Sequence, residues 1–322
     1  MPRTMPALFL TEDEVREVLT MRRAIDAVEE AFRQLAEGGA QNVPRSRASG
    51  KGVMLHTLSA SADYLGLVGW KAYTTSASGA RFHVALYDAA GGTMVALLEA
   101  DHLGRMRTGA ASGVATDHMA RRDAQRVGVL GSGRQARTQL EAVCVVRGIT
   151  QAYVYSPNPE HRERFAEEME PVCKTEVVPV DRPQEAVEDC GIVITATTSS
   201  EPLFDGQLIA EGAHLNVIGS NFLHKAEVDA VTVRRSSPIV CDSIDQCRLE
   251  AGDFVEALEA GNIHWSQIYE LADVVAGRHT GRARQEDVTL FKSVGLGIED
   301  VAVAARVLEI ARTERLGRVL PW

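Results

Sequence analysis

A short apolar run that leads directly into a glycine-rich turn constrains the fold of this 322-residue chain more than any other feature. The apolar run covers residues 126–130, Gly131, Gly133 and Ala136 follow in the pattern Gly-x-Gly-x-x-Ala, and a helix-compatible stretch covers 134–147. In this pattern the first glycine permits a tight turn, the second lets a pyrophosphate approach the backbone, and the third small residue keeps helix and strand close. The helix start offers N–H groups to the anion. A glycine-rich turn alone is weak, but this strand–turn–helix context predicts a dinucleotide-binding site.

The chain around this motif alternates short apolar runs with stretches long enough for crossover helices. That alternation predicts a parallel sheet with helices on both faces. The expected strands are residues 126–130, 152–156, 176–180, 192–197, 214–219 and 239–241.

The N-terminal part of the chain has a different pattern. Thr11 and Glu14 form a capping box, and a second helix with an apolar stripe is expected to end at Gly38. The strands expected after it are residues 53–58, 67–73, 82–87 and 94–99, with a hairpin turn at 88–92 and a helix over 108–122. A last apolar stripe, from Ile298 to Leu308, predicts a helix that packs back on this first part. We therefore expect an α/β chain with an α+β domain over 1–122, completed by 298–322, and a Rossmann domain over 123–297.

Composition excludes several classes of partner. The net charge is -10 without a basic block, which argues against nucleic acid and anionic membranes. No apolar run approaches the ~20 residues that span a bilayer, and the N-terminus lacks a signal-peptide pattern. The five cysteines contain no Cys-x-x-Cys pair, and the nine histidines show no metal-ligand spacing. We expect a soluble, cytoplasmic protein with reduced cysteines and no metal site.

The end of the second expected Rossmann strand bears on the choice of nucleotide. An acidic residue there would bond both ribose hydroxyls and repel a 2′-phosphate. This chain has Ser156, Asn158 and, one helical turn later, Arg162 instead. A hydroxyl, an amide and a guanidinium suit a 2′-phosphate, so we favour NADP(H) over NAD(H). The alternative is that Ser156 and Asn158 cap the next helix.

Three basic residues outside the Rossmann segment are candidates to bind an anionic substrate. Only five lysines occur in the chain, and Lys71 alone lies among apolar residues, where its pKa is easily shifted. Arg45 and Arg107 are the other two, and arginine binds carboxylates in bidentate geometry. Taken singly, each has an ordinary alternative, a snorkelling lysine or a surface charge.

Four motifs together resemble the ornithine cyclodeaminase/mu-crystallin family. They are Arg-Thr-Gly-Ala-Ala at 107–111, Gly-Ser-Gly-Arg-Gln-Ala at 131–136, Gly-Ser-Asn-x-x-x-Lys-x-Glu-Val-Asp at 219–229 and Phe-Lys-Ser-Val-Gly-x-Gly-Ile-Glu-Asp at 291–300. The resemblance implies a homodimer whose subunits join a Rossmann domain to a substrate-binding and dimerisation domain. It also implies that Arg45, Lys71 and Arg107 grip a substrate carboxylate.

The expected site divides into cofactor and substrate groups. We expect Lys71 and Asn221 to be catalytic. The expected cofactor-binding residues are Thr108, Gly131, Ser132, Gly133, Arg134, Gln135, Ala136, Ser156, Asn158, Arg162, Thr197, Gly219 and Val294.

Asn221 is a departure from part of the family. Ornithine cyclodeaminases of the family carry an aspartate at the position that matches it, and an amide cannot relay a proton as a carboxylate does. The resemblance therefore favours an NAD(P)H-dependent reductase of imines next to a carboxylate, such as pyrroline- or piperideine-2-carboxylate. Its small substrate would be a carboxylate-bearing imine or amino acid. The alternatives are an ornithine cyclodeaminase, an ammonia-lyase that forms proline with catalytic NAD, and a dinucleotide-binding protein without catalysis. Lys225 matches a family lysine, with a solvated charge as its alternative role.

Overall fold

The computed structural model describes residues 6–321 and divides the chain into two compact units. The first contains the residues up to Arg107 and those from Leu296 onward, and the second is Thr108–Gly295. The division falls inside helix α3 (Asp101–Met119), whereas the sequence placed a boundary after residue 122 and began this helix at Thr108. The earlier start has no local capping signal, because the Glu12 carboxylate, distant in sequence, accepts the N–H groups of Asp101 and His102.

A seven-stranded sheet forms the body of the first unit, in the order β15-β1-β6-β5-β4-β3-β2, within the described residues. Strands β2 to β6 form an antiparallel meander, and β1 pairs parallel to β6. The elements are β1 Leu8–Leu10, α1 Glu12–Val18, α2 Met21–Glu37, β2 Ala40–Gly50, β3 Val53–Ala62, η1 Asp63–Leu65, β4 Leu67–Ser76, β5 Gly79–Asp88, β6 Met94–Glu99, α10 Gly297–Glu314 and β15 Arg318–Val319.

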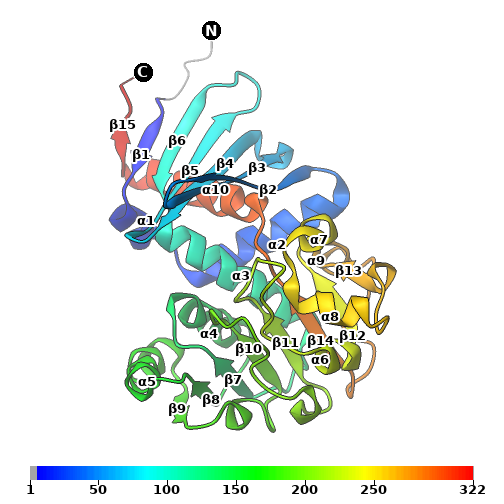
Figure 1. Cartoon of the computed structure of the whole chain (residues 1–322). Helices are drawn as coiled ribbons and strands as arrows, with labels where there is room; N and C mark the ends of the chain where they lie inside the picture. The colour runs from blue at the N-terminus through cyan, green and yellow to red at the C-terminus, as the bar shows by residue number, and fades with distance from the viewer. Residues whose placement is uncertain (1–5, 322) are drawn as a thin grey trace. The chain divides into compact units, whose positions relative to one another are not determined.

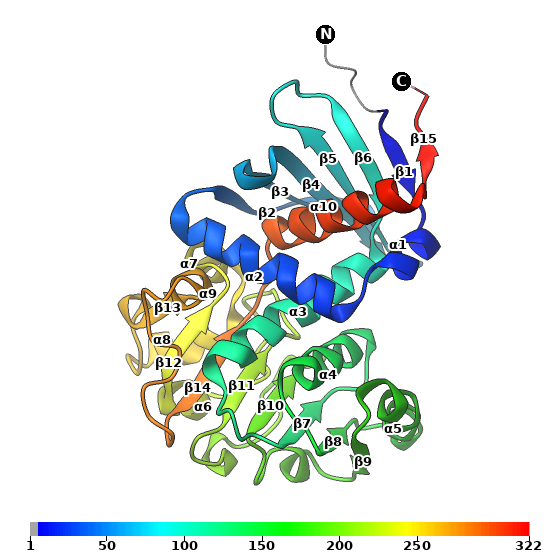
Figure 2. The same ribbon diagram turned by 180° about the vertical axis from the view of Figure 1, so that it is seen from behind.

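Helix α10 lies along one face of this sheet, with α2 beside it, as Figures 1 and 2 show from opposite sides. The predicted α2, its end at Gly38, the hairpin between β5 and β6 and the terminal helix are confirmed. Strand β2 was not predicted, because its sequence is largely polar. It forms through pairing with β3, with an irregularity between Val43 and Ser46.

The second unit contains an eight-stranded parallel sheet in the order β13-β12-β14-β11-β10-β7-β8-β9. All six predicted strands are present. The elements are β7 Arg126–Leu130, α4 Arg134–Val146, β8 Gln151–Tyr155, α5 Pro159–Cys173, β9 Glu176–Val180, η2 Pro183–Ala186, β10 Ile192–Thr195, η3 Gly206–Leu208, β11 His214–Val217, α6 Ala230–Arg235, β12 Ser236–Cys241, α7 Ile244–Glu250, η4 Gly252–Phe254, α8 Val255–Glu259, η5 Trp265–Gln267, β13 Ile268–Glu270, α9 Leu271–Val275 and β14 Val288–Lys292.

Strand order in this sheet reverses at β7, whose neighbours are β8 and β10. In open parallel sheets a ligand binds at such a reversal, at the carboxyl ends of the strands. The predicted α/β fold with a Rossmann-type sheet is therefore confirmed. Strand β14, absent from the prediction, inserts between β11 and β12 from a segment late in the chain. Across residues 6–321, no helix combines the length and apolarity needed to cross a membrane.

Candidate active site

The glycine turn after β7 has the geometry that a dinucleotide pyrophosphate requires. Gly131 has φ +114°, and a Cβ there would overlap the carbonyl oxygen of Ala196. Gly133 is exposed and precedes α4 as its N-cap, without a side-chain cap, and a Cβ there would meet no atom within 4 Å. Ala136, by contrast, is fully buried against the sheet. The turn therefore leaves open space at an uncapped helix N-terminus, which fits an anionic pyrophosphate.

Arg137 supports this turn and was not singled out from the sequence. Its Nη1 donates to the carbonyl oxygen of Gly133 at 3.1 Å and also to that of Ser132. Its guanidinium pairs with Glu168 at 2.6 Å. The loop carbonyls thus turn toward Arg137. Among the other predicted loop residues, Arg134 is exposed and Gln135 is half-buried.

The end of β8 carries the three residues predicted to select the nucleotide. Ser156 is buried, and Arg162 Nη1 donates to its carbonyl oxygen at 3.1 Å. Arg162 also pairs with the exposed Asp181. Asn158 is the N-cap of α5, where its side chain accepts the N–H of His161 at 3.4 Å. The capping alternative therefore holds for Asn158, while Arg162 lies beside the strand end as predicted.

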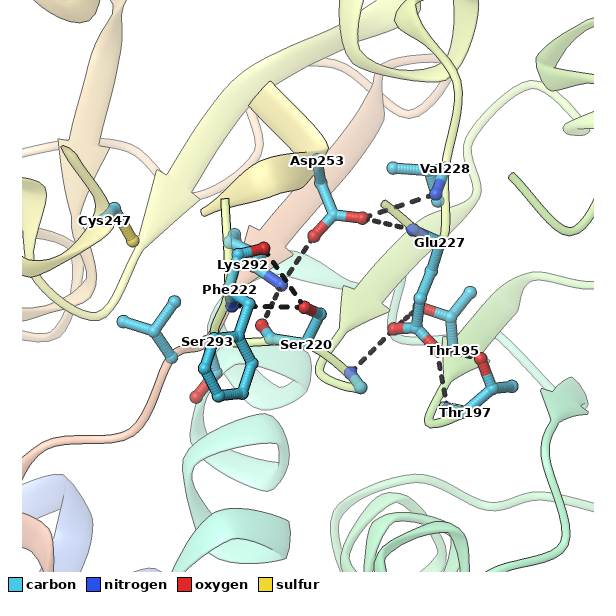
Figure 3. A network of polar contacts seen from close by, with 12 residues as sticks. Thr195, Thr197, Ser220, Phe222, Glu227, Val228, Cys247, Asp253, Lys292 and Ser293 are labelled. Atoms are coloured by element: carbon cyan, nitrogen blue, oxygen red, sulfur yellow. Dashed lines mark hydrogen bonds and ion pairs between the residues drawn. The ribbon is translucent and has the colours of Figure 1, made fainter. Parts of the chain in front are cut away.

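The segments that follow β10 and β11 are held together by a buried carboxylate. Glu227 accepts hydrogen bonds from the backbone N–H groups of Thr197 and Gly219, both at 2.6 Å (Figure 3). Thr197 and Asn221 are half-buried, and Gly219 is exposed. Three predicted site residues thus lie at the ends of adjacent strands. Lys225, whose role was left open, is half-buried in the same loop.

In two further predicted cofactor residues, a backbone group forms a hydrogen bond with a distant side chain. The carbonyl oxygen of Thr108 accepts Gln139 Nε2 at 3.0 Å, which ties α3 to α4. Val294 donates its N–H to Asp242 Oδ2 at 2.8 Å, and the same oxygen accepts the N–H of Gly295 at 2.7 Å. Both residues are buried, and each is anchored through its backbone to a side chain distant in the sequence.

The first unit brings two of the predicted substrate residues onto a pair of buried acids. Lys71 Nζ donates to Asp300 Oδ1 at 2.8 Å. Arg107 pairs with Glu299 at 2.7 Å and with the same Asp300 oxygen at 3.2 Å. Both acids have zero exposure, so these are buried, charge-assisted contacts. Helix α3 approaches closely because it has a glycine there: a Cβ on Gly104 would lie 2.8 Å from Lys71 Nζ.

The charge state of Lys71 is set by this arrangement. Burial and the positive charge of Arg107 lower the pKa of Lys71 to about 8, although Asp300 opposes the shift. The charge of Arg45 lowers the same pKa, which places the third predicted substrate residue within electrostatic range. Arg107 behaves differently: despite its burial, Asp300 and Glu299 raise its pKa. The cluster therefore contains a fixed cation beside an ammonium whose pKa is about 8.

An aromatic row on the sheet adjoins the lysine. The ring of Tyr73 stacks on His56 at 4.2 Å and on Phe82 at 4.9 Å, and Lys71 Nζ lies 5.5 Å from the Phe82 ring. Burial and the charges of Arg47 and Arg45 lower the pKa of His56 to about 4. His56 is therefore neutral at physiological pH, and the row presents flat, uncharged surfaces beside the ammonium.

Sequence reasoning missed the roles of Glu299 and Asp300. Both acids belong to the motif at 291–300, but acidic residues are common in the first turn of a helix, where they stabilise its dipole, so no contact with a cation was predicted for them. The available signal was Lys71 itself, since a buried lysine requires a counter-charge. In the described part of the chain, no group of three or more His, Cys, Asp and Glu side chains is arranged to hold a metal ion.

Comparison with protein families gives a match over nearly the whole chain. The model of the ornithine cyclodeaminase/mu-crystallin family matches residues 5–315. Among curated proteins, an alanine dehydrogenase of Archaeoglobus fulgidus is 32% identical over 323 residues, which cover 97% of this chain and 98% of that protein.

Solved structures of similar proteins have the same fold. The Delta(1)-pyrroline-2-carboxylate reductase of Thermococcus litoralis, in complex with NADH and L-proline, is 35% identical with a TM-score of 0.92, over 97% of this chain and 100% of that one. An archaeal alanine dehydrogenase dimer with bound NAD is 30% identical with a TM-score of 0.92, over 99% of this chain and 100% of that one.

Proposed function

Because the chain belongs to the ornithine cyclodeaminase/mu-crystallin family, we propose that it is an NAD(P)H-dependent reductase of imines that lie next to a carboxylate. The observation that carries this proposal is the buried cluster of Lys71, Arg107 and Asp300, with a lysine pKa of about 8. Pyrroline-2-carboxylate and piperideine-2-carboxylate are substrates of the required chemistry. The first unit supplies the substrate groups in this proposal, and the second supplies the dinucleotide site.

Arg107, Arg45 and Lys71 are assigned to the substrate carboxylate. The planar guanidinium of Arg107 offers bidentate geometry, and its orientation is fixed by Glu299 and Asp300. Holding the substrate in one pose lowers the entropy cost of the reaction, and this positioning is the main contribution of the arginines.

Lys71 is assigned a second role as proton donor to the imine nitrogen. Reduction adds a hydride to the imine carbon and a proton to its nitrogen, and a protonated imine accepts hydride more readily. The bound dinucleotide supplies the hydride. With a pKa of about 8, Lys71 is protonated at neutral pH and still acidic enough to release the proton. Asn221 would orient the nitrogen or a water molecule, because an amide forms hydrogen bonds without titrating.

We assign the dinucleotide as NAD(P)H, with NADPH preferred. Similar proteins have been solved with NADH and with NAD. The preference for NADPH rests on Ser156 in place of an acid and on Arg162 beside the strand end. A homodimer is part of the proposal, in line with the dimeric archaeal alanine dehydrogenase. So is a cytosolic location, since all five cysteines are free.

The test follows nicotinamide absorbance with purified protein and either cyclic imine, using NADPH and NADH in separate reactions. We expect rapid oxidation of the reduced dinucleotide, and a rate lower by about 10²–10⁴-fold in Lys71→Met. Lys51→Met is the matched control, because Lys51 is exposed in the β2–β3 turn. If neither dinucleotide is oxidised while ornithine yields proline and ammonia with catalytic NAD, the proposal is wrong and the protein is a cyclodeaminase.

A further inference from the structure

A buried carboxylate joins the ends of two strands in the second unit. Glu227 Oε1 accepts the N–H and the hydroxyl of Thr197 at 2.6 and 2.7 Å. Its Oε2 accepts the N–H of Gly219 at 2.6 Å and the hydroxyl of Thr195 at 2.9 Å. Four donors thus converge on one carboxylate, from the end of β10 on one side and of β11 on the other (Figure 3).

The position of Glu227 is itself fixed by a buried ion pair. Asp253 Oδ1 accepts the N–H of Glu227 at 2.6 Å and that of Val228 at 3.4 Å, and Asp253 Oδ2 pairs with Lys292 Nζ at 2.6 Å. Lys292 also donates to the carbonyl oxygen of Ser220 at 2.8 Å. Glu227, Asp253 and Lys292 are at most 2% exposed. The loop from Gly219 to Val228 is therefore held at both ends by one polar network.

Two glycines match the shape of this network. A Cβ on Gly219 would overlap the Glu227 carboxylate, and a Cβ on Gly252 would overlap the carbonyl oxygen of Lys225 and lie 2.7 Å from that of Phe222. Any side chain at position 219 would displace the Glu227 carboxylate, and any side chain at position 252 would displace the loop backbone. Gly219 and Glu227 share one sequence motif, and Lys292 lies in another, so the network joins two motifs that are distant in the chain.

The network lies at the carboxyl ends of two strands on one side of the reversal in strand order. The glycine turn after β7 and the strand end of β8 are suited to the pyrophosphate and the adenosine ribose. The strand ends of β10 and β11 lie on the other side of the reversal in strand order, where the nicotinamide half of a dinucleotide binds in such folds. Asn221 directly follows Ser220, whose carbonyl oxygen Lys292 holds.

We propose that Glu227 is a positioning residue that sets the Thr197 and Gly219–Asn221 segments for the nicotinamide half of the cofactor. The proposal rests on the function proposed above. A carboxylate is required, because each of its oxygens faces a backbone N–H that cannot rotate away. The amide of glutamine has one acceptor oxygen, so its nitrogen would face one of these N–H groups and release one segment.

The experiment compares Glu227→Gln with wild type in the binding of two ligands, without an imine substrate. The ligands are the preferred reduced dinucleotide and the matching ADP-ribose fragment, which lacks nicotinamide. We expect the dinucleotide Kd to rise about tenfold, as for loss of a hydrogen bond, while the ADP-ribose Kd stays within about twofold. In the imine assay, kcat should fall more than the KM for the imine rises. Since binding is read without turnover, a wrong substrate assignment leaves this test intact.

Asp229→Asn is the matched control. Asp229 also receives a backbone N–H on each oxygen, from Thr232 at 2.7 Å and Gly206 at 3.0 Å, but it joins no strand ends. We expect both Kd values to stay unchanged in this variant. Equal weakening of both ligands in Glu227→Gln, or the same selective loss in Asp229→Asn, would overturn the proposal.

A milder variant decides the question if Glu227→Gln does not fold. Thr195→Val is isosteric and removes one hydroxyl donor from Glu227. Thr195→Val should raise the Kd for the dinucleotide by a smaller factor than Glu227→Gln does, and leave the Kd for ADP-ribose unchanged. A dinucleotide Kd equal to that of wild type in Thr195→Val, with Glu227→Gln unfolded, counts against a positioning role.

Discussion

Lys71 and Asp300 lie 229 positions apart in the chain and form a fully buried ion pair of 2.8 Å between Nζ and Oδ1. The pair joins the middle of a sheet strand to the first turn of the last long helix. Arg107 Nε forms an ion pair with the same carboxylate oxygen at 3.2 Å, so one acid lies between two cations. The ammonium is held in place while the neighbouring arginines make it easier to deprotonate.

The titration of Lys71 predicts an alkaline limit to activity. Burial and Arg107 lower its pKa to about 8, so the protonated form is present below that pH and is lost above it. We expect kcat/KM for imine reduction to fall as pH rises through about 8. In Lys71→Met, kcat/KM should drop by about 10²–10⁴-fold, as for loss of a general acid. The fall in kcat/KM above pH 8, the alkaline limb of the profile, should also disappear. A wild-type profile that stays flat to pH 10 would rule out Lys71 as the donor.

Asp300 and Glu299 should differ in their effect on that limb. Asp300 raises the pKa of Lys71, so Asp300→Asn should shift the alkaline limb to lower pH. Glu299 contacts Arg107, and Glu299→Gln should raise the KM for the carboxylate substrate while the limb stays near pH 8. The pH profiles of both variants, with circular dichroism to confirm folding, make the comparison. Identical profiles would show that the two acids serve only to neutralise charge.

The strands around the glycine turn could be predicted from the sequence because their signals are local. The turn at Gly131 and the alternation of apolar runs depend on neighbours in the chain, and all six predicted strands formed. The polar strand β2 was not readable, since it exists through pairing with β3. The partners of Lys71 were hidden for the same reason: nothing near residue 71 indicates which acid, far along the chain, will lie beside it. The sequence thus identified the cations, and only the fold identified Asp300 and Glu299 as the acids that pair with them.

The two glycines of the turn after β7 should respond differently to alanine. A Cβ on Gly131 would overlap the carbonyl oxygen of Ala196, and φ of +114° disfavours any side chain. Gly131→Ala should therefore lower the melting temperature as well as dinucleotide affinity. A Cβ on Gly133 would meet no protein atom within 4 Å, so Gly133→Ala should have the melting temperature of wild type. Its affinity for the dinucleotide should fall, because the new Cβ would occupy the expected position of the pyrophosphate. Thermal unfolding and a dinucleotide titration separate the two effects. Undiminished affinity in Gly133→Ala would place the pyrophosphate elsewhere.

The end of β8 should govern the choice between NADPH and NADH. Arg162 donates to the carbonyl oxygen of Ser156, so its guanidinium lies beside the end of β8, where the proposed preference for NADPH requires a cation. Arg162→Gln should raise the Kd for NADPH about tenfold and leave the Kd for NADH unchanged. The reason is that only NADPH carries the 2′-phosphate with which Arg162 would form a charge-assisted contact. Arg164→Gln, an exposed change on the same helix, is the control. Ser156→Asp should reverse the preference, because an acid there bonds the ribose diol and repels the phosphate. Equal weakening of both dinucleotides in Arg162→Gln would mean that Arg162 only braces the strand end through its pair with Asp181, and that the preference for NADPH is wrong.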